Sequence, residues 1–510
     1  MVPWAVILTG AVVALAFYYY IVERLRYFAK SGLPYLKPKI FVGNMAPVVL
    51  KHRSMAEQVK LLYDSFPDSR YFGFHDFTIP TIMLRDPEII KYVTVKNFDN
   101  FVNHSALVNE DVDPFFGKNL FGLRDEKWRE MRSILSPAFT SSKMKAMFQL
   151  VSRCGADFAA HVASRPLPNE IELKDNFTRY TMDVIASAAF GITVDSLGEP
   201  NNEFYMMGRD ATTFDFFRTF KIFLLKIIPK IMGLLRISII DDRVKKFFTH
   251  IVSSTVRSRE AEGKTRNDMI QLMMHARDSG KASNLSMEDM TAQAFVFFFG
   301  GFDTTSTAMS FAAYVIATNG PVQEKLRQEI DTALESCDGQ LSWETFQGMH
   351  YLEAVVNETL RMYPPATFID RVCNKTIELP PAVKGGRPYV AEPGAVFWLP
   401  FYAMHHDPRY FEDPETFDPE RFIDPATGKN REPNGFLPFG SGPRFCIGQR
   451  FAMMEVKLAI VHLLAKCRLE ACSRTRVPIV LSRSSFNITS EHDFWVRAVP
   501  RNRNSDTADR

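Results

Sequence analysis

The sequence predicts a mainly helical protein that is attached to a membrane by its N-terminus. Three apolar segments lead to this fold class. Val2–Val22 carries no charged side chain over a length that can span a bilayer. Between Asp289 and Glu324 the one charged residue is Asp303, which indicates a long helix buried on all sides. A third apolar run with helical spacing, GQRFAMMEVKLAIVHLLAK, follows Cys446.

The N-terminal run is expected to be a single-pass transmembrane anchor, with a cleaved signal peptide as the alternative. No basic residue precedes the run and no clear small-residue cleavage site follows it, whereas Arg24, Arg26 and Lys30 come after it. This charge asymmetry predicts that the rest of the chain faces the cytoplasm. The predicted organisation is an anchor (1–22), a basic, proline-containing linker (23–40), a main domain (41–500) and a polar tail (501–510).

Segment 214–240 is also strongly apolar, but basic residues interrupt it throughout. They are Arg218, Lys221, Lys226, Lys230 and Arg236. Charges at this density argue against a second membrane span. Two alternatives stay open: an amphipathic surface that dips into the lipid interface, and ordinary core helices.

The long apolar segment after Ser286 is predicted to be a helix with room for another group to lie against its backbone. Ser286 and Asp289 predict a capping box at its start. In its middle, Gly300 and Gly301 each cost about 1 kcal/mol of helix stability relative to alanine and leave space beside the backbone. A carboxylate at Asp303 in so apolar a helix is costly enough to need a chemical reason.

The segment PFGSGPRFCIG holds five residues at the spacing FxxGxRxCxG: Phe439, Gly442, Arg444, Cys446 and Gly448. Glycines let a loop turn its backbone N–H groups toward a sulfur atom, and a nearby cation favours the thiolate. The helix that begins after the loop adds the positive end of its dipole. Such a loop is typical of a cysteine thiolate that binds a haem iron and favours cleavage of an O–O bond. A buried free cysteine in a glycine-rich turn is the alternative.

On these residues the chain resembles the cytochrome P-450 family of haem-thiolate monooxygenases, and the resemblance covers essentially the whole sequence. It implies the cytochrome P-450 fold: one mostly helical, haem-binding monooxygenase domain over 41–500 with a smaller β-rich part. It also implies haem b as the cofactor, with the thiolate of Cys446 as the axial ligand to iron. The segment VDPFFGKNLFGLRDEKWREMRSILSPAFTSSKMKAMF looks most similar to insect microsomal family nine, near families six and three.

The resemblance also implies roles for residues outside the cysteine loop. The residues that match haem-propionate partners are Trp128, Arg132, Arg371 and, in the loop, Arg444. The other loop residues expected to bind the cofactor are Phe439, Gly442 and Gly448. Those that match a buried Glu–Arg–Arg network bracing the loop are Glu358, Arg361 and Arg421. The family's acid–alcohol pair, which delivers protons, falls on Asp303 and Thr304. The expected substrate-pocket residues, which in a chain with 44 phenylalanines compete with an ordinary aromatic core, are Phe116, Phe295, Phe299, Ala366 and Thr367.

The implied activity is insertion of one oxygen atom from O₂ into a lipophilic substrate, with detoxification of plant compounds and insecticides as the implied role. The sequence has no flavin or nicotinamide motif, so NADPH is expected to act through NADPH–cytochrome P-450 reductase, with cytochrome b5 as a second donor. The expected location is the endoplasmic reticulum membrane, with the catalytic domain in the cytoplasm. Two alternatives stay open: a haem-thiolate isomerase or dehydratase, against which Asp303–Thr304 argues, and a haem-binding sensor or lipophile carrier.

Composition argues against other classes of protein. The 61 basic and 58 acidic residues give a net charge of +3, which does not indicate a nucleic-acid partner. Six cysteines in 510 residues do not make a disulfide scaffold, and none has zinc spacing. His405 and His406 look like a metal pair, but adjacent residues do not share a face, so they are expected to be surface histidines in a loop.

Overall fold

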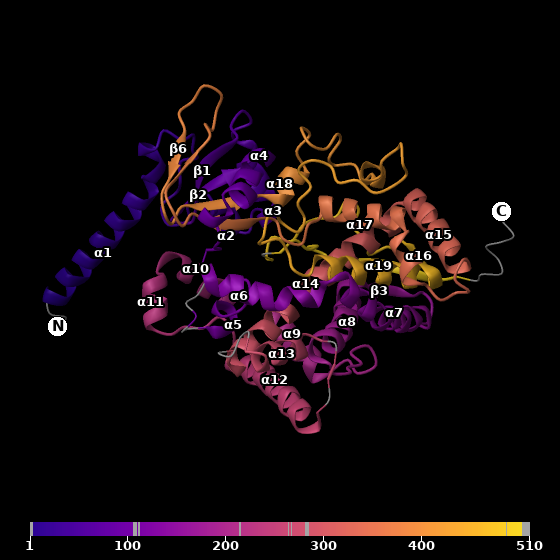
Figure 1. Ribbon diagram of the computed structural model, residues 1–510. Helices are drawn as coiled ribbons and strands as arrows, with labels where there is room; N and C mark the ends of the chain where they lie inside the picture. The colour runs from indigo at the N-terminus through magenta and orange to yellow at the C-terminus, as the bar shows by residue number, and fades with distance from the viewer. Residues whose placement is uncertain are drawn as a thin grey trace.

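The computed structural model describes residues 4–105, 110, 113–213, 216–263, 265–266, 268–280, 285–485 and 487–501. Residues 1–3 of the predicted anchor and residues 502–510 of the predicted tail lie outside the described residues. The described chain is mainly helical with a smaller β part, which confirms the expected fold class (Figure 1).

Helices form most of the body. In the first half of the chain they are α1 (Trp4–Leu25), α2 (Ala46–Val49), α3 (Met55–Asp64), α4 (Pro87–Lys91), α5 (Pro114–Gly117), α6 (Asp125–Leu135), α7 (Ser141–Ala163), α8 (Leu173–Ile185), α9 (Glu203–Thr212), α10 (Phe216–Ile227), α11 (Pro229–Leu234) and α12 (Asp242–Glu262). In the second half they are α13 (Met269–Asp278), α14 (Met287–Thr318), α15 (Gly320–Glu335), α16 (Trp343–Gln347), α17 (His350–Met362), α18 (Phe401–His405) and α19 (Gln449–Lys466). Short 3₁₀ or π turns are η1 (Tyr27–Lys30), η2 (Tyr92–Lys96), η3 (Phe98–Asn100), η4 (Ser136–Phe139), η5 (Ala186–Phe190) and η6 (Pro419–Phe422).

The strands form small sheets at the margins of the helical body. They are β1 (Tyr71–Asp76), β2 (Ile79–Leu84), β3 (Glu170–Glu172), β4 (Ile369–Val372), β5 (Ile377–Leu379), β6 (Tyr389–Ala391), β7 (Val396–Leu399), β8 (Cys467–Glu470) and β9 (Trp495–Pro500). Among the described residues, one sheet has the order β1-β2-β7-β4, with β2 and β7 parallel and the other pairs antiparallel. The others are β3-β9-β8 and the hairpin β5-β6.

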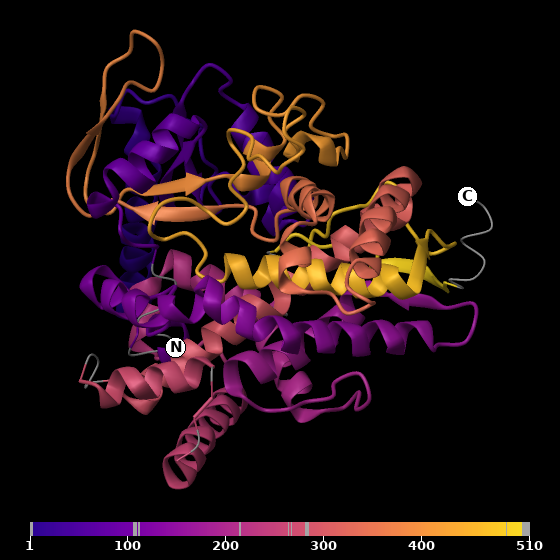
Figure 2. The same cartoon turned by 45° about the vertical axis from the view of Figure 1, so that its right-hand side comes forward.

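α14 runs through the centre of the helical body and positions the site. Its predicted capping box is confirmed: the N–H of Asp289 donates to Ser286 Oγ at 3.1 Å, and the N–H of Ser286 donates to Asp289 Oδ2 at 3.0 Å. The helix packs against α8, α12 and α19, and α19 in turn lies beside the long helix α7 (Figure 2). α14 and α19 are therefore neighbours inside the protein.

α1 projects from the body near the first sheet (Figure 1). Val6–Leu25 is long and apolar enough to cross a membrane, with a mean hydropathy of 1.8. Its last turn is held on the body, because Ile21 is buried and the carbonyl oxygen of Arg24 lies 3.3 Å from His75 Nε2. The chain expected to be a linker then packs on the body through Phe28.

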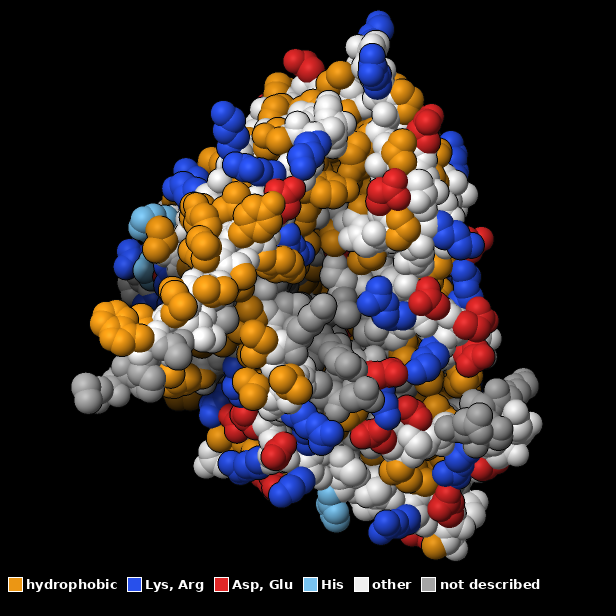
Figure 3. Space-filling view, turned by 90° about the vertical axis from the view of Figure 1, so that its left-hand side faces the viewer, with side chains coloured by type: hydrophobic (Ala, Val, Ile, Leu, Met, Phe, Trp, Pro, Cys, Tyr) orange, Lys and Arg blue, Asp and Glu red, His pale blue; other side chains and the backbone are white. Residues whose placement is uncertain are grey.

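The apolar segment 214–240 forms α10 and α11 at the surface. Several of its large apolar side chains are exposed, among them Phe217, Phe220 and Leu234, the last at 84%. The buried side chains of this segment, among them Leu225 and Met232, form a small hydrophobic cluster that is separate from the main core. Exposure on one side and burial on the other favour the amphipathic alternative over ordinary core helices. Figure 3 shows hydrophobic side chains gathered on the face of the molecule from which α1 projects.

Candidate active site

A cavity of about 500 Å³ lies between α14 and the loop that leads into α19. This volume is within the range of small-molecule sites in proteins. The loop contributes to its wall Phe439, Arg444, Cys446 and Gly448, and α14 contributes Val296, Phe297, Gly300, Gly301, Thr304, Thr305 and Ala308. The cysteine and the glycine pair that the sequence singled out are therefore brought to one cavity.

The cysteine loop is closed by its own backbone. The N–H of Cys446 donates to the carbonyl oxygen of Phe439 at 2.8 Å. Desolvation by the surrounding protein raises the pKa of the Cys446 thiol. The N–H groups of Gly448 and Gln449 and the charge of Arg132 act to lower this pKa. Groups that favour a thiolate are thus in place around a sulfur atom whose side chain opens into the cavity.

Gly442 has a different place from the one expected of a cofactor-binding residue. It lies outside the cavity wall formed by the described residues and presses against η2. Its φ is +72°, and a Cβ there would lie 1.9 Å from the carbonyl oxygen of Thr94. Only glycine fits this close backbone contact, so Gly442 shapes the loop rather than touching the cavity.

A cluster of arginines lies at one side of the cavity. Arg132, Arg444 and Trp128 line it, and Arg444 sits over the Trp128 ring at 4.1 Å while donating to the carbonyl oxygen of Val102 at 2.8 Å. Arg371 lies behind this wall, fully buried, with Nη1 3.4 Å from His104 Nδ1.

This cluster fits an anionic cofactor. Burial lowers the pKa of Arg371 to about 10, and burial together with Arg371 and Arg132 lowers the pKa of Arg444 to about 9. Nε and Nη2 of Arg371 are buried and have no hydrogen-bond partner among the described residues. Two carboxylates would neutralise the arginines and accept hydrogen bonds from the unpaired N–H groups of Arg371. Haem carries two such carboxylates, its propionates.

The predicted Glu358–Arg361–Arg421 contacts are present, with Glu358 and Arg361 fully buried and Arg421 partly buried. Glu358 Oε2 and Oε1 accept from Arg361 Nε at 2.6 Å and Nη2 at 2.8 Å, and Arg421 Nε lies 3.4 Å from Oε1. Burial raises the pKa of the Glu358 carboxyl, and Arg361 opposes that shift. Glu358 also accepts the N–H of Asp418 at 2.9 Å, which ties the helix to the segment before the cysteine loop.

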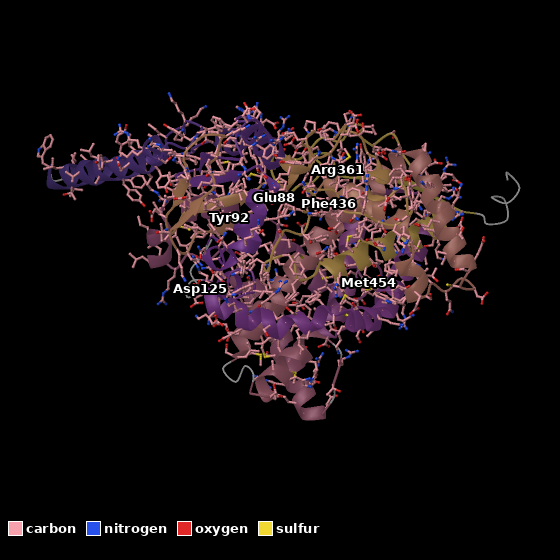
Figure 4. All side chains as sticks on the ribbon, turned by 45° about the horizontal axis from the view of Figure 1, so that its top comes forward. Glu88, Tyr92, Asp125, Arg361, Phe436 and Met454 are labelled. Atoms are coloured by element: carbon pink, nitrogen blue, oxygen red, sulfur yellow. The ribbon has the colours of Figure 1, made fainter. Side chains whose placement is uncertain are left out.

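The structure corrects the expectation that His405 and His406 are surface residues. Both are buried, His405 in the last turn of α18. His405 accepts the N–H of Leu437 at 2.9 Å, and its carbonyl oxygen accepts from Arg361 at 2.8 Å. The expectation was wrong because the polar sequence around the pair hides this connecting role. The His405 ring also packs against Phe436 with centroids 5.4 Å apart, so His405 contacts both Arg361 and Phe436, which are labelled in Figure 4.

The acid and the alcohol of α14 point in different directions. Thr304 lies on the cavity wall, and its hydroxyl donates to the carbonyl oxygen of Gly300. Asp303 instead accepts from Lys174 Nζ on α8 at 2.9 Å and from Asn487 Nδ2 at 2.9 Å. Burial alone would raise the pKa of Asp303, but Lys174 and Asn487 hold that pKa below its ordinary value.

The expected substrate-pocket residues divide in the structure. Ala366 lines the cavity. Phe295 is fully buried and packs edge-on against Phe248 at 5.4 Å, and Phe116 and Phe299 pack against it and each other. Thr367 is buried, and none of these four is among the described residues that line the cavity. Successive residues of a helix are rotated by about 100°, so the face of Phe297 and Gly301 is turned away from that of Phe295.

Sequence reasoning missed residues whose partners are remote in the chain. Lys174 is 129 residues from Asp303, and no local spacing marks the pair. His104, on the cavity wall, lies 2.9 Å from Asp370 Oδ1 beside the arginine cluster. Burial lowers the pKa of His104 to about 4, so the ring is neutral at neutral pH.

Comparison with known proteins agrees with this geometry. Residues 33–495 match the family described as Cytochrome P450. The chain is 45% identical over 500 residues to cytochrome P450 9e2 of Blattella germanica, covering 92% of this chain and 93% of that relative. It is 38% identical to probable cytochrome P450 9f2 of Drosophila melanogaster (98% and 100% covered) and 33% identical to cytochrome P450 6j1 of Blattella germanica (93% and 94%). The expected similarity to insect families nine and six is confirmed. Proteins of this kind carry haem with a cysteine thiolate ligand and use NADPH through a reductase. The chain therefore belongs to the cytochrome P450 family and is a P450 monooxygenase.

Proposed function

We propose that this protein is a microsomal monooxygenase that oxidises lipophilic foreign compounds, with Cys446 as the axial ligand of its haem. The observation that carries the proposal is the Cys446 side chain on the wall of a cavity shared with Gly300, Gly301 and Thr304. Bound there, haem supplies the site at which O₂ is activated. Trp128, Arg132, Arg371 and Arg444 are the residues proposed to hold its propionates.

Thr304 and Asp303 are proposed to deliver protons. Because the Thr304 hydroxyl donates its one proton to the Gly300 carbonyl oxygen, Oγ1 is left as a hydrogen-bond acceptor on the cavity wall. Asp303 is about a quarter exposed, as is Lys174, so the ion pair connects solvent with α14. Lys174 also donates to Ser306 Oγ at 2.8 Å and Thr307 Oγ1 at 2.6 Å, and these bonds give its ammonium group acceptors besides Asp303 when the carboxylate takes up a proton.

The proposed substrate is an apolar small molecule. Most of the described side chains on the cavity wall are apolar. Phe139 stacks on Phe297 with ring centroids 5.4 Å apart, and Ile369, Ala366 and Val296 also line the cavity. Such a wall binds a lipophile through burial of apolar surface and places few demands on its polar groups. The similarity to insect families nine and six supports detoxification of xenobiotics, insecticides included, as the biological role.

The proposed location is the endoplasmic reticulum membrane, with the catalytic domain in the cytoplasm. α1 is the proposed span. α10 and α11, several of whose apolar side chains are exposed, lie on the side of the molecule from which α1 projects (Figure 1). Basic residues on the C-terminal side of α1 support a cytoplasmic body. NADPH–cytochrome P-450 reductase is the proposed electron donor and cytochrome b5 a second one.

Oxygen uptake by the purified, membrane-reconstituted protein tests this function. With a panel of lipophilic toxins, uptake and product formation should require both NADPH and the reductase. Conversion of a lipid peroxide without NADPH would instead identify an isomerase or dehydratase. Haem binding without turnover of any compound would identify a sensor or carrier.

A further inference from the structure

Asp113 is a buried carboxyl group that joins two segments far apart in the chain. It lies immediately before α5 and has no exposed surface. Its Oδ2 accepts from the Ser238 hydroxyl at 2.6 Å and from the N–H groups of Ile239 and Ile240 at 3.0 and 3.2 Å. These three donors lie between α11 and α12. One side chain therefore fixes the end of the α10–α11 segment (216–234) to the start of α5.

Phe116 of α5, which Asp113 positions, packs against two separate hydrophobic clusters. The N–H of Phe116 donates to the carbonyl oxygen of Asp113 at 3.2 Å. The Phe116 ring packs against Phe295 and Phe299 of α14, with centroids 6.0 and 5.8 Å apart. It also packs against the small hydrophobic cluster of α10 and α11, which lie beside α5 (Figure 1). Phe116 therefore lies between the α10–α11 segment and α14.

The cavity is closed on the side of α10 and α11. None of the described residues that line the cavity comes from α5, α10 or α11. Phe116, Phe295 and Phe299 lie behind the cavity wall instead, packed against one another. A lipophile that leaves the bilayer along the α10–α11 segment meets these aromatic rings first. The rings must separate before the lipophile can reach the cavity.

The hydrogen bonding of Asp113 is incomplete in this closed arrangement. Oδ1 is buried and has no partner among the described residues. No described lysine or arginine pairs with the carboxyl group. The cation that reaches its network is Lys245, whose Nζ donates to Ser238 Oγ at 2.6 Å. A buried carboxyl oxygen without a partner has lost hydration that it regains in water. Three hydrogen bonds thus favour the closed arrangement and one unpaired oxygen opposes it, as suits a contact that opens and closes.

We propose that the three hydrogen bonds of Asp113 to residues 238–240 form a latch that controls entry of lipophilic substrates from the bilayer. With the latch closed, α5 and the α10–α11 segment are held together over the phenylalanines of α14. When the latch opens, the segment moves away from α5 and the aromatic rings separate. Asp113 is thus a positioning residue, because it controls access without touching substrate or haem. The entry of substrate rests on the proposed function; the latch itself does not.

Amide hydrogen exchange of the membrane-reconstituted holoprotein tests the latch itself. In the wild type the N–H groups of Ile239 and Ile240 should be protected, because Asp113 is their acceptor. Asp113→Ala should speed exchange across residues 216–240 by about tenfold, and Asp113→Asn by less, because its amide oxygen still accepts. Asp242→Asn is the matched control: this neighbouring carboxylate is 87% exposed, and its loss should leave exchange unchanged. Wild-type exchange in Asp113→Ala, or equally fast exchange in the control, overturns the latch.

The kinetics of ligand binding separate control of access from damage to the cavity. The probe is clotrimazole, a lipophilic imidazole that binds haem iron, added from phosphatidylcholine vesicles and followed by the Soret shift in a stopped-flow instrument. Asp113→Ala should raise the association and dissociation rate constants severalfold by the same factor, so that Kd is unchanged. Ser238→Ala, which removes one of the three donors, should raise both by less.

Unchanged rate constants in Asp113→Ala, or a change in only one of them, overturn the role in access. Clotrimazole binding needs no turnover. An inactive wild-type protein would therefore refute the proposed function and leave the exchange and binding results on the latch intact.

Discussion

Replacing Glu358 by alanine should destabilise the segment that holds the cysteine loop in place. The change leaves the guanidinium of Arg361, which has no exposed surface, without its counter-charge and frees the N–H of Asp418. The acceptors that remain for Arg361 are the carbonyl oxygens of His405 and Thr416 at 2.8 and 3.3 Å. Removing one partner of a buried ion pair costs about 3–5 kcal/mol, a large part of the roughly 5–15 kcal/mol that stabilises a typical domain.

The assay is haem content per protein together with the urea midpoint of unfolding. Glu358→Ala should yield mostly haem-free protein with a lower midpoint, and Glu358→Gln should be intermediate because the amide oxygen still accepts from Arg361. Glu420→Ala is the matched control: Glu420 pairs with Lys325, both about half exposed, and such pairs contribute at most about 1 kcal/mol. Wild-type haem content and midpoint in Glu358→Ala would refute the bracing role.

Further predictions concern the loop and the proton path. Gly442→Ala should lose haem, because the new Cβ would lie 1.9 Å from the carbonyl oxygen of Thr94. Gly300→Ala is the control and should keep haem, because no atom lies within 4 Å of its Cβ. Equal haem contents in the two variants would argue against the close contact at Gly442. Thr304→Ala should divert NADPH to peroxide, and unchanged coupling would remove its proton role. Lys174→Met should raise the pKa of Asp303 and move the acidic limb of the coupling–pH profile to higher pH, an unmoved profile being the contrary result.

The cysteine loop and the start of α14 could be predicted because short, fixed spacings encode them. Ser286 and Asp289 close a ring of two hydrogen bonds within one turn, so four residues of sequence suffice to predict it. The loop spacing similarly brings Cys446 and Phe439 into one backbone hydrogen bond. The apolar runs predicted the long helices, whereas the smaller β-rich part was expected only from the family resemblance.

The rest depends on how distant segments meet. Packing against α8, α12 and α19 sets which side of α14 faces the cavity. An error of two positions along the helix put Phe295 on the cavity wall in place of Phe297. The partner of Asp303 comes from α8, and no pattern around Lys174 announces it. The sequence around His405 is typical of a loop. In the structure His405 instead ends α18 and accepts a hydrogen bond from the N–H of Leu437, just before the cysteine loop.

The absorption spectrum of the reduced protein under carbon monoxide tests the central claim most directly. If the Cys446 thiolate binds the haem iron, the wild type shows the red-shifted Soret band of thiolate ligation, and Cys446→Ser shows it no longer while its circular dichroism is unchanged. A correctly folded, haem-loaded wild type without that band, or a Cys446→Ser variant that keeps it, would contradict the account.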